Sequence, residues 1–137
     1  ICSVNQEHFP KLISFIPNEY KFVLSNCGKS IYELIGKNKK INIKNMKEQI
    51  NCIIYNLKQC KIKHLDIDTP NRPGKNICVN DKGVISLIDF DIASINNNYK
   101  SEQIKNRNDI CYGRDYDYNY LRNTLTHVIS LISTNNI

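Results

Sequence analysis

The chain contains 137 residues, of which 41% are hydrophobic and 23% are charged, as in ordinary globular domains with one modest core. No apolar run approaches the roughly 18 residues of a membrane-spanning helix, so we expect no membrane partner. The net charge is +6, but the basic residues are spread along the chain and no aromatic-basic RNA motif occurs. A cleft for a nucleotide or an acidic substrate accounts for this charge as well as a nucleic-acid surface does, and we do not expect nucleic-acid binding.

The N-terminus, Ile1–Val4, has neither the charged nor the apolar region of a signal peptide, and it lacks an initiator methionine. We therefore expect a fragment, a processed product or a trimmed chain. The six cysteines form no CxxC pair and no tight framework spacing, which favours reduced thiols in a cytoplasmic protein over disulfides. These residues are Cys2, Cys27, Cys52, Cys60, Cys78 and Cys111.

The first expected elements are two short apolar strands, Lys11–Ile16 and Tyr20–Leu24, on either side of the turn-forming Pro17–Glu19. Two such runs around a short turn predict a hairpin. Farther on, Ser30–Glu33 has the form of a capping box, in which the serine caps and the glutamate reaches back. The sequence therefore predicts a short helix that begins there and ends at Gly36.

The tripeptide Gly28-Lys29-Ser30, between a strand and a helix, is reminiscent of a phosphate-binding P-loop. That motif requires another glycine five residues before Gly28, and the residue at that position is Val23. Without the second glycine the loop lacks the usual nest of backbone amides for phosphate, so we do not expect a P-loop enzyme.

The segment Asn45–Lys61 has the clearest helical pattern in the chain. Its apolar residues recur at helical spacing and define one face: Met46, Ile50, Ile53, Ile54, Leu57 and Cys60. We expect the burial of this face to be the largest single contribution to the core, at roughly 1.5–3 kcal/mol per large side chain.

A second hairpin is predicted where two β-rich runs, Ile77–Val79 and Val84–Ile88, flank a cluster of turn residues. Asp66 and Asn76 precede this hairpin and Asp89 follows it, so the hairpin gathers all three at one end. A carboxylate there can accept a proton from an attacking hydroxyl, while a second carboxylate and an amide oxygen are suitable ligands for Mg²⁺. These are the parts that phosphoryl transfer requires. The alternative is a solvated hairpin with acidic residues at its ends.

The same stretch resembles the signature of eukaryotic-type protein kinases, in which H-R-D-L-x-x-x-N is followed by a hairpin and by D-F-G. His64-Leu65-Asp66-Ile67 is similar to the start of the catalytic loop, Asn76 to its asparagine, and Asp89-Phe90-Asp91 to D-F-G. The resemblance implies that Asp66 is the catalytic base or orienting group. It also implies that Asn76 and Asp89 hold Mg²⁺ against the phosphates of ATP.

The resemblance extends from about His8 to the end of the chain and implies an α+β, protein-kinase-like fold that is only partial. Residues 1–28 would be the last N-lobe strands and the hinge, and residues 29–137 the first half of the mainly helical C-lobe, together forming a single domain fragment. Asn26, Cys27 and Gly28 are the implied ATP-binding residues of the hinge. The helix at 45–61 is similar in position to the long helix that leads into the catalytic loop.

After the D-F-D tripeptide, the polar and aperiodic Ser94–Asn108 corresponds to the activation segment, and we expect it to be mobile. Asp117–Ser133 is then predicted to be a helix, similar in position to the central helix of the kinase C-lobe. An aspartate at its start braces the catalytic loop in that family, and Asp117 is the candidate, with Asp115 second. The alternative is an acidic residue placed there because the helix dipole favours it.

Four departures from the kinase signature are visible. Leu65 replaces the arginine before the base, which weakens the expectation of control by activation-loop phosphorylation. Asp68 lies where serine/threonine kinases have a lysine, and Asp91 replaces the glycine of D-F-G. Asn76 lies 10 positions after Asp66, against about five in the motif.

Lys75, or else Arg72, is our candidate for the missing positive charge near the transferred phosphate. The leading hypothesis is a serine/threonine-type, protein-kinase-like phosphotransferase that moves the γ-phosphate of ATP to a protein hydroxyl. The chain alone is expected to be inactive, because it contains neither a Gly-rich loop nor the strand lysine. One alternative is a pseudokinase or truncated binding module without catalysis, which Asp91 favours. Another is a small-molecule kinase of related fold.

Overall fold

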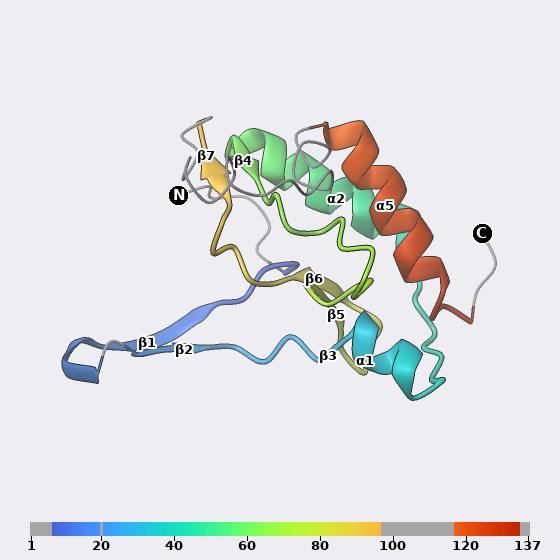
Figure 1. Ribbon diagram of the computed structural model, residues 1–137, viewed down its shortest axis with the longest axis horizontal. Helices are drawn as coiled ribbons and strands as arrows, with labels where there is room; N and C mark the ends of the chain where they lie inside the picture. Colours follow the sequence, from blue (N-terminus) through green and yellow to red (C-terminus); the bar gives the residue numbers. More distant parts are fainter. Residues whose placement is uncertain (1–6, 20, 97–116, 135–137) are drawn as a thin grey trace.

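The computed structural model describes residues 7–19, 21–96 and 117–134, which form a small α+β domain (Figure 1). The predicted α+β class is confirmed, and among the described residues no helix is long and apolar enough to cross a membrane. The elements in chain order are β1 (Leu12–Ile16), the 3-10 turn η1 (Pro17–Glu19), β2 (Lys21–Leu24), β3 (Lys29–Ser30), α1 (Ile31–Gly36), α2 (Met46–Gln59), β4 (Ile62–Lys63), β5 (Ile77–Val79), β6 (Ile85–Leu87), β7 (Ser94–Ile95) and α5 (Tyr118–Ser130).

Strands β1 and β2 form the predicted N-terminal hairpin. They pair in antiparallel register from Ile16↔Lys21 to Leu12↔Leu24. The hairpin extends away from the two long helices (Figure 1), and its Leu12 and Ile13 side chains are 59% and 65% exposed. The apolar residues of β1, all of them exposed, therefore contribute little to the core of the described domain.

The second predicted hairpin is also present, as β5 and β6 joined by a turn at Asn80–Gly83. The side-chain oxygen of Asn80 accepts hydrogen bonds from the backbone N–H groups of Lys82 and Val84, both at 2.9 Å. Gly83 has φ 77°, a left-handed conformation that suits glycine. β3 adds to the other side of β5, giving a three-stranded antiparallel sheet of order β3-β5-β6.

Helix α1 begins as its sequence predicts. The Ser30 hydroxyl accepts the backbone N–H of Glu33 at 3.2 Å, which is an N-cap hydrogen bond. The Glu33 carboxylate does not complete the capping box, however, because it pairs with Lys37 one turn later at 3.0 Å. The helix ends at Gly36, as expected.

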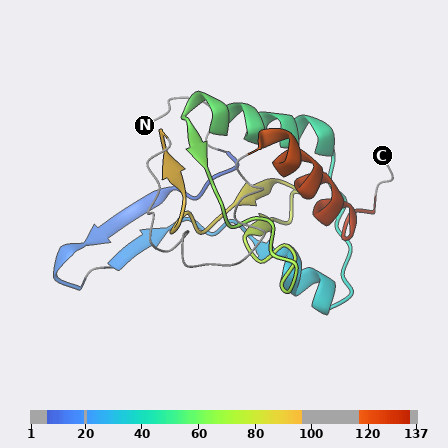
Figure 2. The same cartoon turned by 45° about the horizontal axis from the view of Figure 1, so that its top comes forward.

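Helix α2 supplies the face around which the core is built. All the large apolar residues of its predicted face are buried: Met46, Ile50, Ile53, Ile54 and Leu57. They pack with the apolar residues of α5, and Figure 2 shows these two helices side by side above the β5–β6 hairpin. The expectation that this face is central to the core is confirmed.

The cysteines differ in part from expectation. Cys27, Cys52 and Cys78 carry free thiols, whereas Cys60, the C-cap of α2, is disulfide-bonded. Burial raises the pKa of the Cys78 thiol to about 11, so this thiol stays protonated at neutral pH. The prediction of reduced thiols is therefore wrong for Cys60, because a disulfide depends on distance in space rather than on sequence spacing. The expected cytoplasmic location stays a prediction.

The chain after the second hairpin is more regular than predicted. β7 pairs with β4 in antiparallel register, Ile62↔Ile95 and Lys63↔Ser94, where an aperiodic segment was expected from Ser94 onward. Two residues are too few to show a period of two, so the strand left no pattern in the sequence. The remainder of the expected activation segment, residues 97–108, lies outside the described residues.

Candidate functional site

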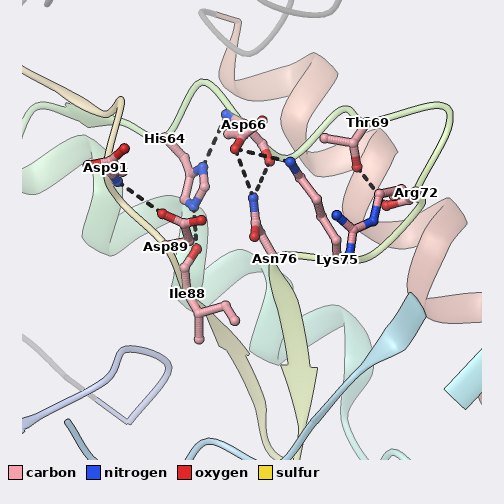
Figure 3. Close-up of polar contacts among 9 residues, drawn as sticks. All are labelled: His64, Asp66, Thr69, Arg72, Lys75, Asn76, Ile88, Asp89 and Asp91. Carbon is pink, nitrogen blue, oxygen red and sulfur yellow. Dashed lines mark hydrogen bonds and ion pairs between the residues drawn. The ribbon is translucent and has the colours of Figure 1, made fainter. Parts of the chain in front are cut away.

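The open end of the β5–β6 hairpin brings together residues that are distant in sequence. The backbone N–H of Ile88 donates to the carbonyl of Asn76 at 3.0 Å, which extends the antiparallel ladder by one pair. Asp89 follows immediately, so Asn76 and Asp89 lie at the same end of the hairpin, as predicted from the turn between the strands (Figure 3).

Asp66 lies against this end and contacts two side chains. The amide nitrogen of Asn76 donates to the Asp66 backbone carbonyl at 2.8 Å and to its carboxylate at 3.1 Å. The ammonium of Lys75 lies 3.5 Å from the same carboxylate oxygen, and the Asp66 side chain is only 15% exposed. Because a carbonyl only accepts hydrogen bonds, the amide nitrogen must face Asp66, which leaves the amide oxygen of Asn76 as its possible cation ligand.

His64 is the buried support that connects Asp66 to the hairpin. Its Nε2–H donates to the carbonyl of Ile88 at 2.7 Å, and its Nδ1 accepts the backbone N–H of Asp66 at 3.1 Å. The side chain is fully buried, and burial lowers the pKa of His64. Only the neutral imidazole with hydrogen on Nε2 satisfies both bonds, so the neutral ring determines where the Asp66 backbone lies relative to Asp89.

This arrangement predicts an acid-dependent loss of stability. The pKa of His64 in the folded state lies below its unfolded value near 6.5. The contribution of His64 to the free energy of unfolding is therefore complete above pH 6.5, and it is lost as the pH falls through the folded-state pKa. A single proton gives a slope of at most about 1.4 kcal/mol per pH unit. Urea unfolding between pH 7.5 and 5 is expected to show a shallower pH dependence in His64→Gln than in the native protein. His127→Gln, which alters an exposed histidine, is expected to keep the native slope, and equal slopes in all three proteins would contradict the assignment.

Two non-glycine residues at the site have left-handed backbones. Leu65 has φ 71° and Asp89 has φ 59°. Such conformations cost on the order of 1–3 kcal/mol each and often occur at functional sites. Each residue is restrained by its surroundings, because Leu65 is buried and the Asp89 carboxylate accepts the N–H of Asp91 at 3.4 Å. The Phe90 ring, 4.5 Å from the His64 ring, restrains the same turn.

Two residues at this end of the hairpin offer oxygen donors that a divalent cation could use. The exposed Asp89 carboxylate and the Asn76 amide oxygen are hard donors of the type that Mg²⁺ binds. Within residues 7–19, 21–96 and 117–134 there is no group of three or more His, Cys, Asp or Glu side chains that could hold a metal ion. Two oxygen donors would suit Mg²⁺ in the mode in which one or two protein ligands are completed by phosphate oxygens and water.

The predicted hinge residues lie against the turn end of the β5–β6 hairpin, whereas Asp66 lies at its open end. The Asn26 side chain accepts the N–H of Gly28 at 2.8 Å, and Cys27 is half-buried beside them. A Cβ at Gly28 would lie 2.3 Å from the carbonyl oxygen of Val79, and its φ is 99°. Only glycine permits this approach, which places Gly28 against the turn end of β5.

Two tyrosines of α5 support the loop that carries Asp66, and sequence reasoning missed them. The Tyr118 hydroxyl donates to the Ile62 carbonyl at 2.8 Å, and the Tyr120 hydroxyl donates to the Asp68 carboxylate at 2.9 Å. Asp117, the predicted brace, is exposed and instead caps α5 by accepting the N–H of Asn119 at 2.8 Å. Asp117 therefore acts at the N-terminus of the helix, which was the alternative expectation for this residue. Asp115 lies outside the described residues.

The structure also separates the two candidate cations. Arg72 places its guanidinium over the Tyr32 ring, 5.2 Å from its centroid, whereas the Lys75 ammonium contacts Asp66. The hydroxyl of Thr69 donates to the Arg72 carbonyl at 2.9 Å, which closes the turn from Thr69 to Arg72 (Figure 3). Of these two basic side chains, Lys75 is therefore the one that contacts Asp66.

No protein-family model matches the chain, and no curated protein matches its sequence. The chemistry of the site consequently rests on its own residues. Asp66, supported by a buried histidine, contacts an ammonium and an amide, and Asp89 lies at the same end of the hairpin on a left-handed turn.

Proposed function

We propose that the chain is the partial catalytic domain of a protein-kinase-like phosphotransferase of the serine/threonine type. Its reaction would move the γ-phosphate of ATP to a protein hydroxyl. The observation that carries this proposal is the gathering of Asp66, Lys75, Asn76 and Asp89 at the open end of one hairpin. The chemical types and chain order of Asp66, Asn76 and Asp89 are those of the kinase signature that the sequence resembles, and Lys75 supplies the positive charge that this signature lacks here.

Asp66 is the proposed base or orienting group for the acceptor hydroxyl. Its backbone is held on one side by His64 and on the other by Asn76, so its carboxylate is placed before any substrate arrives. A carboxylate positioned in this way can accept the hydroxyl proton during transfer. Lys75, 3.5 Å away, supplies a positive charge next to the position where the phosphoryl group would pass.

Asn76 and Asp89 are the residues that would hold Mg²⁺. The bound ion would neutralise negative charge on the phosphates. The hydrogen bond between Asn76 and the Asp66 carboxylate connects a metal ligand directly to the base. Movement of either residue therefore disturbs the other. This coupling supports a shared reaction centre.

The proposed adenine-binding and metal-binding residues lie at opposite ends of β5, so that a nucleotide would lie along this strand. Asn26, Cys27 and Gly28 lie at the turn end of this strand, and Asn76 lies at its open end. The three residues of β5 span about 10 Å at the usual rise per residue. An adenine at the hinge would thus direct its phosphates toward Asn76 and Asp89.

A non-catalytic binding module is the second candidate. The β1–β2 hairpin exposes large apolar side chains, among them Leu12, Ile13 and Phe15, which monomeric proteins usually cover. Asp91 in place of glycine at the D-F-G position also favours this reading. The metal experiment below and the turnover experiment in the Discussion distinguish the two functions.

Asp89→Ala is expected to abolish the gain in ATP affinity that Mg²⁺ produces, because it removes the carboxylate ligand. Calorimetric titration of the full-length protein with ATP, with and without Mg²⁺, measures this gain. Asp81→Ala is the matched control, since Asp81 is an exposed aspartate in the turn at the opposite end of the same hairpin. An unchanged metal dependence in Asp89→Ala would remove the metal assignment.

A further inference from the structure

The loop over residues 66–76 contains two consecutive turns that share Arg72 (Figure 3). The backbone N–H of Arg72 donates to the carbonyl of Thr69 at 3.1 Å, and the N–H of Lys75 donates to the carbonyl of Arg72 at 3.2 Å. Each turn has a proline at its second position, and the second turn has Gly74, with φ 77°, at its third. These residue types suit turns of this kind, so the backbone of Arg72 is held on both sides.

The second turn places Arg72 next to the proposed reaction centre. The first and fourth residues of a β-turn, here Arg72 and Lys75, have Cα atoms less than about 7 Å apart. The Lys75 ammonium in turn lies 3.5 Å from the Asp66 carboxylate. Each residue of an extended chain spans about 3.3 Å. A side chain two or three residues away from a hydroxyl held at Asp66 can therefore reach Arg72.

Helix α1 directs the side chain of Arg72. The guanidinium lies over the ring of Tyr32, 5.2 Å from its centroid. The N–H of Tyr32 donates to the carbonyl of Gly74 at 3.4 Å, which joins the helix to the loop where this contact forms. A guanidinium that stacks on a ring keeps the N–H donors in its own plane available to a ligand.

Arg72 differs in its partners from the other charged residues of the loop. Asp66 and Lys75 pair with each other, and the carboxylate of Asp68 accepts the hydroxyl of Tyr120 at 2.9 Å. Arg72 is exposed, and it takes part in none of the ion pairs within the described ranges. A ligand can therefore pair with this guanidinium without breaking an existing ion pair.

We propose that Arg72 selects protein acceptors that carry an acidic side chain two or three residues from the hydroxyl that receives the phosphate. A guanidinium binds a carboxylate through two parallel hydrogen bonds, which adds a geometric preference to the electrostatic one. The two turns hold Arg72 in place before the acceptor binds, which reduces the entropy lost on binding. This inference rests on the proposed phosphotransferase function and adds to it the chemistry of the protein substrate.

Transfer from labelled ATP by the full-length protein to two matched serine peptides tests the inference. One peptide carries aspartate two and three positions from the serine on both sides, and the other carries asparagine there. Arg72→Gln is expected to raise KM for the aspartate peptide about fivefold, as for the loss of a good exposed ion pair, and to leave KM for the asparagine peptide and for ATP unchanged. Lys82→Gln is the matched control, because Lys82 is an exposed cation in the turn at the opposite end of the β5–β6 hairpin.

Reversal of the charge gives a sharper comparison. In Arg72→Glu, a peptide with lysine at the same positions is expected to become a better acceptor than the aspartate peptide, which a purely structural role of Arg72 does not predict. Tyr32→Leu is expected to weaken the preference for the aspartate peptide, because it removes the ring on which Arg72 lies. Tyr32→Phe keeps the ring and should retain the preference.

An equal effect of Arg72→Gln on both peptides would overturn the inference, as would a rise in KM for ATP alone. A full-length protein that transfers phosphate to neither peptide contradicts the proposed function instead. Fluorescence anisotropy of the labelled peptides then decides the inference separately. Binding of the aspartate peptide that Arg72→Gln weakens supports it, whereas equal or absent binding of the two peptides overturns it.

Discussion

Asp66→Asn is expected to lower the rate of phosphate transfer about 10²–10⁴-fold while leaving ATP affinity unchanged. The amide has nearly the same shape as the carboxylate, and its oxygen can still accept the hydrogen bond from Asn76. It cannot accept a proton, and it loses the ion pair with Lys75. The loss should appear in kcat rather than in KM, because the interaction is made in the transition state.

The measurement is transfer from labelled ATP by the full-length protein to a panel of protein and small-molecule acceptors. Asp68→Asn is the matched control, since Asp68 is two residues away and its carboxylate accepts the hydroxyl of Tyr120. Turnover that is equally fast in Asp66→Asn and in the native protein would show that Asp66 is not the base. A native protein that transfers phosphate to no acceptor, yet binds a protein partner, would establish the binding module instead.

Leu57→Ala is expected to lower the free energy of unfolding by roughly 2–5 kcal/mol. The Leu57 side chain is 1% exposed and lies in the core between α2 and α5, so its truncation leaves a cavity. A loss of this size is a large fraction of the stability of a typical domain. Ile53, also buried on this face, should behave in the same way.

Urea unfolding of the two proteins measures the difference. Tyr55→Ala is the matched control, because Tyr55 lies on the same helix with 56% of its surface exposed. It is expected to change stability by no more than about 0.5 kcal/mol, as is usual for surface substitutions. A loss below about 1 kcal/mol in Leu57→Ala would be incompatible with a buried face on α2.

The sequence alone determined the elements whose formation depends on residues within one short stretch of the chain. Helix α2 was recognisable because one apolar face repeats over four turns, and its observed bounds, Met46–Gln59, differ from the expected range by one or two residues at each end. Both hairpins were recognisable because their turns lie between the paired strands. Ser30 predicted the start of α1, because its hydroxyl caps the helix.

The short pairings between distant segments came only from the tertiary structure. β3 pairs with β5 and β4 pairs with β7, and each of β3, β4 and β7 has two residues. A strand of two residues has no periodicity, so its partner is set by the packing of the longer elements around it. The disulfide at Cys60 and the tyrosine contacts of α5 are likewise effects of proximity in space.

The candidate site shows the same division. Residue types and their order named Asp66, Lys75, Asn76 and Asp89, and the hairpin explained why its two ends meet. The fold decided which side of the Asn76 amide faces Asp66, and it placed Lys75 rather than Arg72 at the carboxylate. It also held Asp89 in a left-handed conformation. Side-chain direction and backbone strain depend on neighbours that are distant in sequence, which is why the residues alone could not reveal them.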